Sequence, residues 1–257
     1  MLQCHRQSAR APTNRHPTVL IGPRAACLLC LLTLLLVRGV AVAQVSGHVA
    51  LLSDYRYRGE SLTDGRPALQ AAVNYDHSSG LFLGALASTV RIDPAVSGLS
   101  AQLYAGYARS FSERASWDIG VVTYLFPHTL LVERGYDYTE AFVGASYDTV
   151  NARLYYSDDY FGAGGKAVYL EVNASRPLNE RVALTGHLGY LDHRQTRQPL
   201  AGGQDHSQLD FKAGIAIDVT GFTLELSMVG TNAPHDACPA GTGHCNTTGL
   251  VSVSRPF

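Results

Sequence analysis

The sequence predicts an all-β protein, a single antiparallel transmembrane β-barrel of about twelve strands whose two chain termini lie on the periplasmic side. Three observations predict it. Only 16% of the 257 residues are charged, against roughly 25% in an average soluble domain, and the mean hydropathy is near zero. From residue 45 onward, apolar and polar residues alternate along segments that read as strands with one apolar and one polar face. The links between these segments alternate between short and long, as they do in barrels that cross the bacterial outer membrane.

The composition excludes several other classes of protein. The longest apolar run, residues 25–37, has 13 residues, whereas a membrane-spanning helix needs about 17 to 25. The 14 tyrosines, 8 phenylalanines and 25 glycines suit strands and turns rather than a disordered chain. The net charge is −1 and no basic cluster occurs, so we expect no nucleic acid as a partner.

Residues 1–43 have the pattern of a cleavable secretory signal peptide. Four arginines precede or border the apolar run, and Ala41-Val42-Ala43 forms a small-residue cleavage site before Gln44. We therefore expect residues 44–257 to form the barrel. The leader holds five arginines and no acid, so the remaining 214 residues carry 15 bases against 21 acids, a net charge of −6.

The alternation is clearest at 168–175 and 207–218, where apolar residues occupy every second position. Each predicted strand has about the 9 to 11 residues that a tilted strand needs to cross a bilayer. The expected strands are 45–57, 67–76, 81–91, 99–109, 117–126, 137–147, 152–160, 166–175, 181–191, 207–218, 222–230 and 248–257.

A soluble β-sandwich is the alternative fold. Its strands recur every 8 to 12 residues, whereas 214 residues over twelve strands give about 18 residues per strand.

The lengths of the links predict which end of each strand is periplasmic. Bacterial barrels have short periplasmic turns and longer outer loops. The short links are 77–80, 110–116, 148–151, 176–180 and 219–221, and the longer ones are 58–66, 92–98, 127–136, 161–165, 192–206 and 231–247.

The low charge has a cause in this fold, because one face of every strand contacts lipid and omits charged residues. Tyrosine rings are enriched at membrane interfaces, and seven tyrosines near the predicted strand ends are expected there. They are Tyr55, Tyr57, Tyr75, Tyr107, Tyr147, Tyr156 and Tyr190.

Several segments resemble the TorF family of porins, first catalogued as a conserved proteobacterial family of unknown function. The segment VSGHVALLSDYRYRG at 45–59, followed by TDGRPA at 63–68, is similar to the opening of that family. The match recurs in YAGY at 104–107, YDYTE at 136–140 and LYYSDDYFG at 154–162.

The ending VSVSRPF at 251–257 is similar to the terminal strand that the barrel-assembly machinery reads through a final aromatic residue, here Phe257. Arg255 departs from the apolar or aromatic residue usual at its position, although a side chain this close to the interface can snorkel. The resemblance implies a porin-like barrel in the bacterial outer membrane, with membrane lipid and the assembly machinery as partners.

The predicted function is a porin-like channel for passive diffusion of small hydrophilic solutes or ions, without a cofactor. Eight strands leave a filled interior and 16 to 18 an aqueous channel, so about twelve predict a narrow lumen. Six acids and three bases among the candidate lumen residues predict a weak cation preference. In the alternative interpretation the bases pair with the acids and plug the barrel. The candidates are Asp54, Arg56, Arg58, Gln70, Asn74, Gln102, Asp118, Glu140, Glu171, Asn173, Asp210, Lys212 and Glu225.

Two other functions stay open. An outer-membrane lipid hydrolase would need a serine nucleophile beside a histidine base, and His187 with Asn173 or Ser175 is the best-placed set. No nucleophile motif surrounds these residues, so no catalytic residue is predicted. A structural or adhesive barrel would act through its loops, above all the loop that contains Cys238 and Cys245.

Cys238 and Cys245 are the two cysteines of the exported segment, and an oxidising compartment favours a disulfide between them. The bond would stabilise the barrel by roughly 2.5 kcal/mol in the chain-entropy model. His235 and His244 lie in the same segment, so a soft metal site is the alternative.

Overall fold

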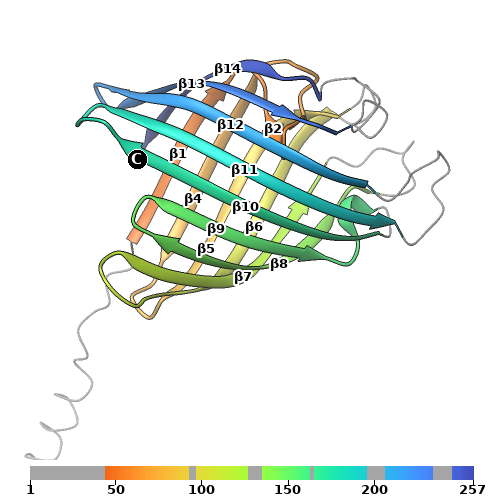
Figure 1. Cartoon of the computed structure of the whole chain (residues 1–257), viewed down its shortest axis with the longest axis horizontal. Helices are drawn as coiled ribbons and strands as arrows, with labels where there is room; N and C mark the ends of the chain where they lie inside the picture. Colours follow the sequence, from red (N-terminus) through yellow and green to blue (C-terminus); the bar gives the residue numbers. More distant parts are fainter. Residues whose placement is uncertain (1–43, 93–96, 127–134, 163–164, 196–205, 234–244) are drawn as a thin grey trace, which may run out of the picture. The chain divides into compact units, whose positions relative to one another are not determined.

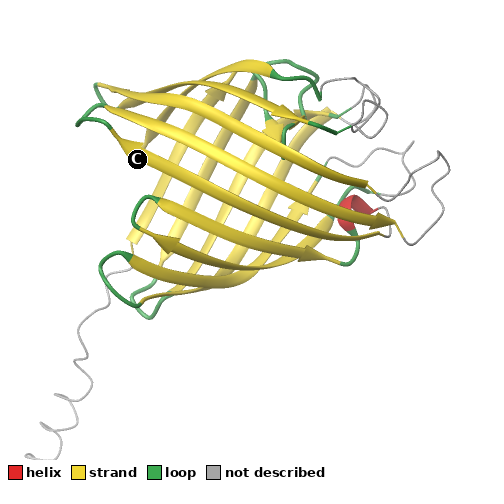
Figure 2. Cartoon of the chain, viewed as in Figure 1, coloured by secondary structure: helices red, strands yellow, loops and turns green. Residues whose placement is uncertain are grey.

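The protein is a closed antiparallel barrel of twelve strands, seen from the side in Figure 1 and Figure 2. The computed structural model describes residues 44–92, 97–126, 135–162, 165–195, 206–233 and 245–257. The barrel strands are β1 (Gln44–Leu52), β4 (Ala68–Asp76), β5 (Leu81–Arg91), β6 (Ser97–Ser110), β7 (Ala115–Leu125), β8 (Tyr138–Tyr147), β9 (Val150–Ser157), β10 (Gly165–Pro177), β11 (Val182–Gln195), β12 (His206–Val219), β13 (Phe222–Thr231) and β14 (Thr248–Pro256). The predicted fold class and strand number are confirmed.

Three short elements lie outside the barrel wall. Strands β2 (Arg56–Tyr57) and β3 (Glu60–Ser61) pair with each other in a separate two-stranded sheet. The 3-10 turn η1 (Tyr160–Gly162) follows β9. No helix in the described part of the chain has the length and hydropathy of a membrane span.

The barrel closes between its first and last strands. β1 pairs with β4 on one side and with β14 on the other, with Val49 opposite Arg255. The backbones of Gly47 and Phe257 exchange two hydrogen bonds, with N to O distances of 3.1 and 2.9 Å. Both ends of the barrel chain therefore lie at the end that carries the short turns, on the left in Figure 1.

The links alternate in length as predicted. Asp148 and Thr149 alone join β8 to β9, and Thr220 and Gly221 alone join β12 to β13. Asp148, Thr220 and Gly221 adopt left-handed backbone conformations, which tight hairpins require. The opposite end carries the longer links, including residues 53–67 between β1 and β4.

The outward face of the wall is apolar. Leu83, Leu103, Leu188 and Leu209 point away from the barrel and are about half or more exposed. Their strand neighbours point inward and are buried or half-buried, as in β8 and β10, where exposure alternates residue by residue. Only the outward face of each strand would contact lipid, so the apolar side chains on that face would make insertion into a bilayer favourable.

Inside the wall, aromatic rings lie over glycines on the neighbouring strand. Phe82 pairs across the strands with Gly106, and Phe142 with Gly120. A Cβ atom at Gly106 would approach Phe82 Cζ to 2.5 Å, and one at Gly120 would approach Phe142 Cζ to 2.6 Å. The absence of a side chain at these glycines lets the rings pack flat against the backbone.

The largest buried apolar cluster lies within the barrel at the long-loop end. The 53–67 segment contributes Tyr55 and Leu62, 8% and 2% exposed, and the surrounding strands contribute inward side chains near their loop ends. The segment therefore occupies part of the lumen. The other buried residues of the cluster, from the wall strands, the residues just beyond them and the turn η1, are Ala68, Val90, Ile92, Val122, Tyr124, Phe126, Tyr138, Phe142, Tyr160, Ala167, Tyr169 and Leu191.

Three sequence predictions are wrong at this end. The first strand ends at Leu52 rather than at residue 57, because the chain turns inward at Ser53. Tyr55 and Tyr57 consequently pack inside the barrel and not at a membrane interface. The strand predicted at 152–160 ends at Ser157, because Tyr160 enters the turn η1.

Candidate functional site

The inward segment is organised around the carboxylate of Asp54. Its Oδ1 accepts hydrogen bonds from Ser61 Oγ at 2.6 Å and Thr63 Oγ1 at 2.7 Å, and its Oδ2 accepts one from Arg56 Nε at 2.6 Å. Asp54 is 4% exposed. These bonds hold the two arms of the β2–β3 hairpin together inside the barrel.

The hairpin carries Arg58 and Gly59 at its tip. Both residues have positive φ, 51° and 81°, which is the conformation of a type I′ turn. A Cβ atom at Gly59 would lie 2.8 Å from Thr231 Cβ and 2.9 Å from Asp210 Cβ, so only glycine lets the tip approach the wall this closely. The hairpin thereby sends the Arg58 side chain across the lumen to the opposite wall.

Arg58 forms the most buried ion pair among the described residues. Its Nη2 donates to both carboxylate oxygens of Glu140, at 2.9 and 2.7 Å, and the two side chains are 4% and 1% exposed. Tyr124 Oη also donates to Glu140, at 3.3 Å. A charged pair this buried is held at one geometry, because either charge alone would be costly to desolvate.

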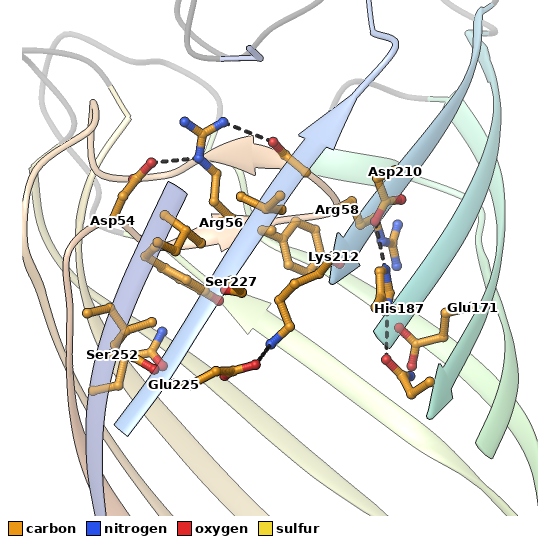
Figure 3. Close-up of a pocket in the computed structure, with 18 of the residues that line it drawn as sticks. Asp54, Arg56, Arg58, Glu171, His187, Asp210, Lys212, Glu225, Ser227 and Ser252 are labelled. Atoms are coloured by element: carbon orange, nitrogen blue, oxygen red, sulfur yellow. Dashed lines mark hydrogen bonds and ion pairs between the residues drawn. The ribbon is translucent and has the colours of Figure 1, made fainter. Parts of the chain in front are cut away.

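A cavity of about 420 Å³ lies beside the hairpin, and Figure 3 shows its polar lining. Ten of the thirteen residues predicted for the lumen line it: Asp54, Arg56, Arg58, Gln70, Gln102, Glu171, Asn173, Asp210, Lys212 and Glu225.

The other three predicted residues lie close by. Asn74 and Asp118 line a second cavity of about 520 Å³ nearer the short turns, and Gln102 lines both cavities. Glu140 is the carboxylate bound to Arg58. Tyr124 and Tyr155 are also shared by the two cavities, so the cavities adjoin at these side chains. A third cavity of about 490 Å³ shares Asn173 and Lys212 with the first.

Lumen bases pair with carboxylates. Besides Arg56 and Arg58, Lys212 Nζ lies 3.0 Å from Glu225 Oε1 and is about one third exposed. Glu171 differs, since it accepts a hydrogen bond from Tyr155 Oη at 3.0 Å but has no ion-pair partner among the described residues. The predicted lumen bases therefore lie beside acids, whereas the carboxylate of Glu171 has no base beside it among the described residues.

His187 lies in a network with Asn173, Tyr169 and Asp210. Its Nδ1 is 2.7 Å from Asn173 Oδ1 and its Nε2 is 2.7 Å from Asp210 Oδ1, and Figure 3 shows His187 beside Asp210. Tyr169 Oη is 3.1 Å from the same Nε2. Among the described contacts of His187 there is no serine hydroxyl, which the lipid-hydrolase alternative would require.

Sequence reasoning missed two lumen residues. Arg153 lies in the second cavity, where its Nε is 2.9 Å from Asp118 Oδ2. It is the inward neighbour of the outward Leu154, so the alternation could have identified it. Glu60 is half-buried in the hairpin, and burial raises its pKa from 4.5 to about 7, opposed by Gln208 and Arg58. No local pattern marks Glu60.

The predicted loop features fall partly outside the described residues. Cys245 is 3% exposed, but Cys238, His235 and His244 are not described, so the disulfide and the alternative metal site stay predictions. Within the described ranges, no group of three or more histidine, cysteine or acidic residues could hold a metal ion. The signal peptide at 1–43 also lies outside them.

A family profile described as "Bacterial protein of unknown function (Gcw_chp)" matches residues 38–257. The chain belongs to the Gcw_chp family. This description of the Gcw_chp family names no activity, so the resemblance to TorF porins stays a prediction. A comparison with curated proteins found no match.

Among solved structures, the KdgM porin is similar at 10% identity with a TM-score of 0.50, covering 84% of this chain and 99% of that one. The NanC porin has 10% identity and a TM-score of 0.49, covering 83% and 99% of the two chains. OprD from Pseudomonas aeruginosa has 12% identity and a TM-score of 0.39, covering 85% and 66%. At this identity, the likeness to the KdgM porin shows a shared barrel fold.

Proposed function

We propose that the protein is a porin-like channel of the bacterial outer membrane, through which small hydrophilic solutes or ions diffuse passively. The single observation that carries this proposal is the set of adjoining polar cavities inside a closed, outwardly apolar barrel. An apolar wall without open strand edges suits a bilayer, and a polar interior suits water and solutes. The short-turn end, where both ends of the barrel chain lie, is then periplasmic.

The β2–β3 hairpin narrows this channel. It occupies part of the lumen at the long-loop end. It is bonded to the wall at β8, through Arg58 to Glu140, and the adjoining Tyr55 is bonded to β6, where its Oη accepts a hydrogen bond of 2.8 Å from Gln102 Nε2. Twelve strands already leave a lumen between a filled barrel and a wide porin. We therefore infer that the narrowed lumen admits only small solutes.

A weak preference for cations follows from the lumen charges. Asp54, Glu171, Asp210 and Glu225 line the first cavity with three bases, two of which pair with acids in that lining. Rings of acidic side chains favour cations, whereas paired charges contribute little field. The carboxylates of Glu171 and Asp210 carry the proposed preference.

The register of the wall offers a direct test. Leu52 pairs with Ala68, so a two-residue Asn-Gly turn can replace residues 53–67 without stretching β1 or β4. In liposomes, we expect the unmodified protein to admit small sugars and the shortened variant to swell the vesicles faster and admit larger sugars. Both proteins are first checked for folding by their heat-dependent gel mobility.

A matched control replaces Thr220-Gly221 by Asn-Gly, which changes a turn but leaves the hairpin in place. Its swelling rate should equal that of the unmodified protein. If neither the unmodified nor the shortened folded protein lets any sugar pass, the proposed channel for small hydrophilic solutes is wrong.

A further inference from the structure

Arg58 is held by the wall as a bound cation would be. Its guanidinium carbon lies 3.9 Å from the ring centroid of Tyr169, 5.1 Å from that of Tyr160 and 5.8 Å from that of Tyr155. Glu140 neutralises it through two hydrogen bonds to one nitrogen. We call Glu140, Tyr155, Tyr160 and Tyr169 the tyrosine cage.

The residues of the tyrosine cage come from three strands of the wall and from the turn η1, whereas its occupant comes from the hairpin. Glu140 lies on β8, Tyr155 on β9, Tyr169 on β10 and Tyr160 in the turn η1. β8, β9 and β10 are consecutive strands of the barrel, and η1 follows β9. The hairpin itself contributes one further ring, that of Tyr57, at 4.9 Å from the guanidinium carbon. Arg58 is 82 positions away from Glu140 and reaches it only because the hairpin folds inward.

The fit between Arg58 and the cage is incomplete. Arg58 Nε and Nη1 are buried and have no hydrogen-bond partner among the described residues. Aromatic faces attract positive charge but satisfy N–H donors poorly. Arg58 also adopts φ of 51°, in the left-handed region that residues other than glycine rarely occupy. The cage is thus suited to a positive charge, and only in part to an arginine.

We propose that the tyrosine cage is a binding site for organic cations with ammonium or guanidinium groups, and that Arg58 is its tethered occupant. A solute enters from the 420 Å³ cavity, which Arg58, Tyr155 and Tyr169 line, when the hairpin tip moves away. Glu171 and Asp210 line the same cavity and raise the local concentration of cations. This inference names the solute class of the proposed channel, and rests on that function only for the route of entry.

Because Arg58 is attached to the cage through the hairpin, it competes with any free cation for the site in the unmodified protein. An occupant on a short link has an effective concentration of about millimolar, against which a free cation must compete. We therefore expect weak binding by the unmodified protein and stronger binding once Arg58 is removed.

The test uses the full chain folded in detergent micelles, where no conduction is needed. The Arg58→Ala variant should melt at a lower temperature, and methylguanidinium should raise its midpoint by several degrees at fixed ionic strength. Urea is the uncharged control, because it is planar like methylguanidinium but neutral. At the same concentration it should leave the melting midpoint of Arg58→Ala unchanged.

Two further variants locate the effect. Lys212→Ala removes a lumen base whose partner is Glu225 and should not respond to methylguanidinium. Adding Tyr169→Leu to Arg58→Ala should abolish the response. If Arg58→Ala does not fold, its refolding yield with and without methylguanidinium becomes the readout, and Arg58→Gln, which retains a neutral donor for Glu140, is measured in parallel.

Equal effects of methylguanidinium and urea on both Arg58 variants would overturn the cage, even if the protein conducts ions. A response specific to methylguanidinium in a protein that forms no channels would instead support the cage and refute the channel.

Discussion

At the scale of single residues, burial decides which charges matter. The pair between Arg58 and Glu140 has almost no contact with solvent, whereas Lys212 and Glu225 are about one third and one fifth exposed. Removing one residue of a buried ion pair leaves the other charge buried without a counter-charge. In an exposed ion pair, the remaining charged side chain is stabilised by water. The same substitution should therefore have very different consequences at the two sites.

We expect Glu140→Ala to lower the free energy of unfolding by about 3 to 5 kcal/mol, and the matched Glu225→Ala to lower it by about 1 kcal/mol or less. Urea unfolding of the refolded protein in lipid vesicles measures both. Equal losses at the two positions would show that the Arg58 pair is not the buried one.

Glycines opposite aromatic rings offer a second residue-scale prediction. A methyl group at Gly106 would meet Phe82 Cζ at 2.5 Å and the backbone oxygen of Ile119, whereas at Gly186 it would meet nothing within 4 Å. Gly106→Ala should destabilise the barrel by about 1 to 3 kcal/mol through overpacking. Gly186→Ala, measured by the same unfolding curves, should change stability by less than about 0.5 kcal/mol. A tolerated Gly106→Ala would mean that Phe82 does not pack against this backbone.

At the scale of elements, strands and hairpin differ in how far local sequence determines them. A spanning strand has lipid on one side and the lumen on the other, so its alternation is a local pattern and predicts all twelve wall strands. The segment 53–57 keeps that alternation but turns inward, because Asp54 bonds to Ser61 and Thr63 further along the chain. The alternation of polar and apolar residues carries no information about such contacts between separate positions.

For the lumen residues too, local sequence predicts some features and not others. Alternation identifies inward polar residues such as Glu140, and would identify Arg153 by the same rule. It cannot give their partners, because the meeting of Arg58 and Glu140 depends on the hairpin and on the barrel register together.

The hairpin also carries a carboxyl group that titrates near neutral pH. Burial raises the pKa of Glu60 from its ordinary 4.5 to about 7, so the folded state binds more protons than the unfolded state between these values. Its contribution to stability is therefore present below about 4.5 and lost as the pH rises to about 7. Above that pH, Glu60 adds a negative charge to the hairpin.

We expect the cation preference of the channel to increase between about pH 6 and pH 8, because Glu60 becomes charged in this window. Ion selectivity in planar bilayers at the two pH values measures this increase. Glu60→Gln should remove most of the difference and should also flatten the fall in stability between about pH 5 and pH 7. An unchanged pH dependence in Glu60→Gln would exclude Glu60 as its source.

At the scale of the whole molecule, low overall charge is a consequence of how the barrel divides its surfaces. The outward face holds the exposed leucines and valines, and most lumen charges lie in ion pairs, formed with the hairpin or between wall strands. The acids exceed the bases, so the interior has a negative field that a narrow lumen concentrates. The proposed channel and its proposed ion preference thus depend on the same feature, the polar interior of the barrel.

The most direct measurement is the current through the purified, folded protein in a planar bilayer that separates two concentrations of potassium chloride. The proposed channel predicts discrete conductance steps, with a reversal potential whose sign corresponds to potassium passing more readily than chloride. Folded protein that inserts into the bilayer but gives no discrete steps would contradict the account, and a reversal potential of the opposite sign would contradict its charge assignment.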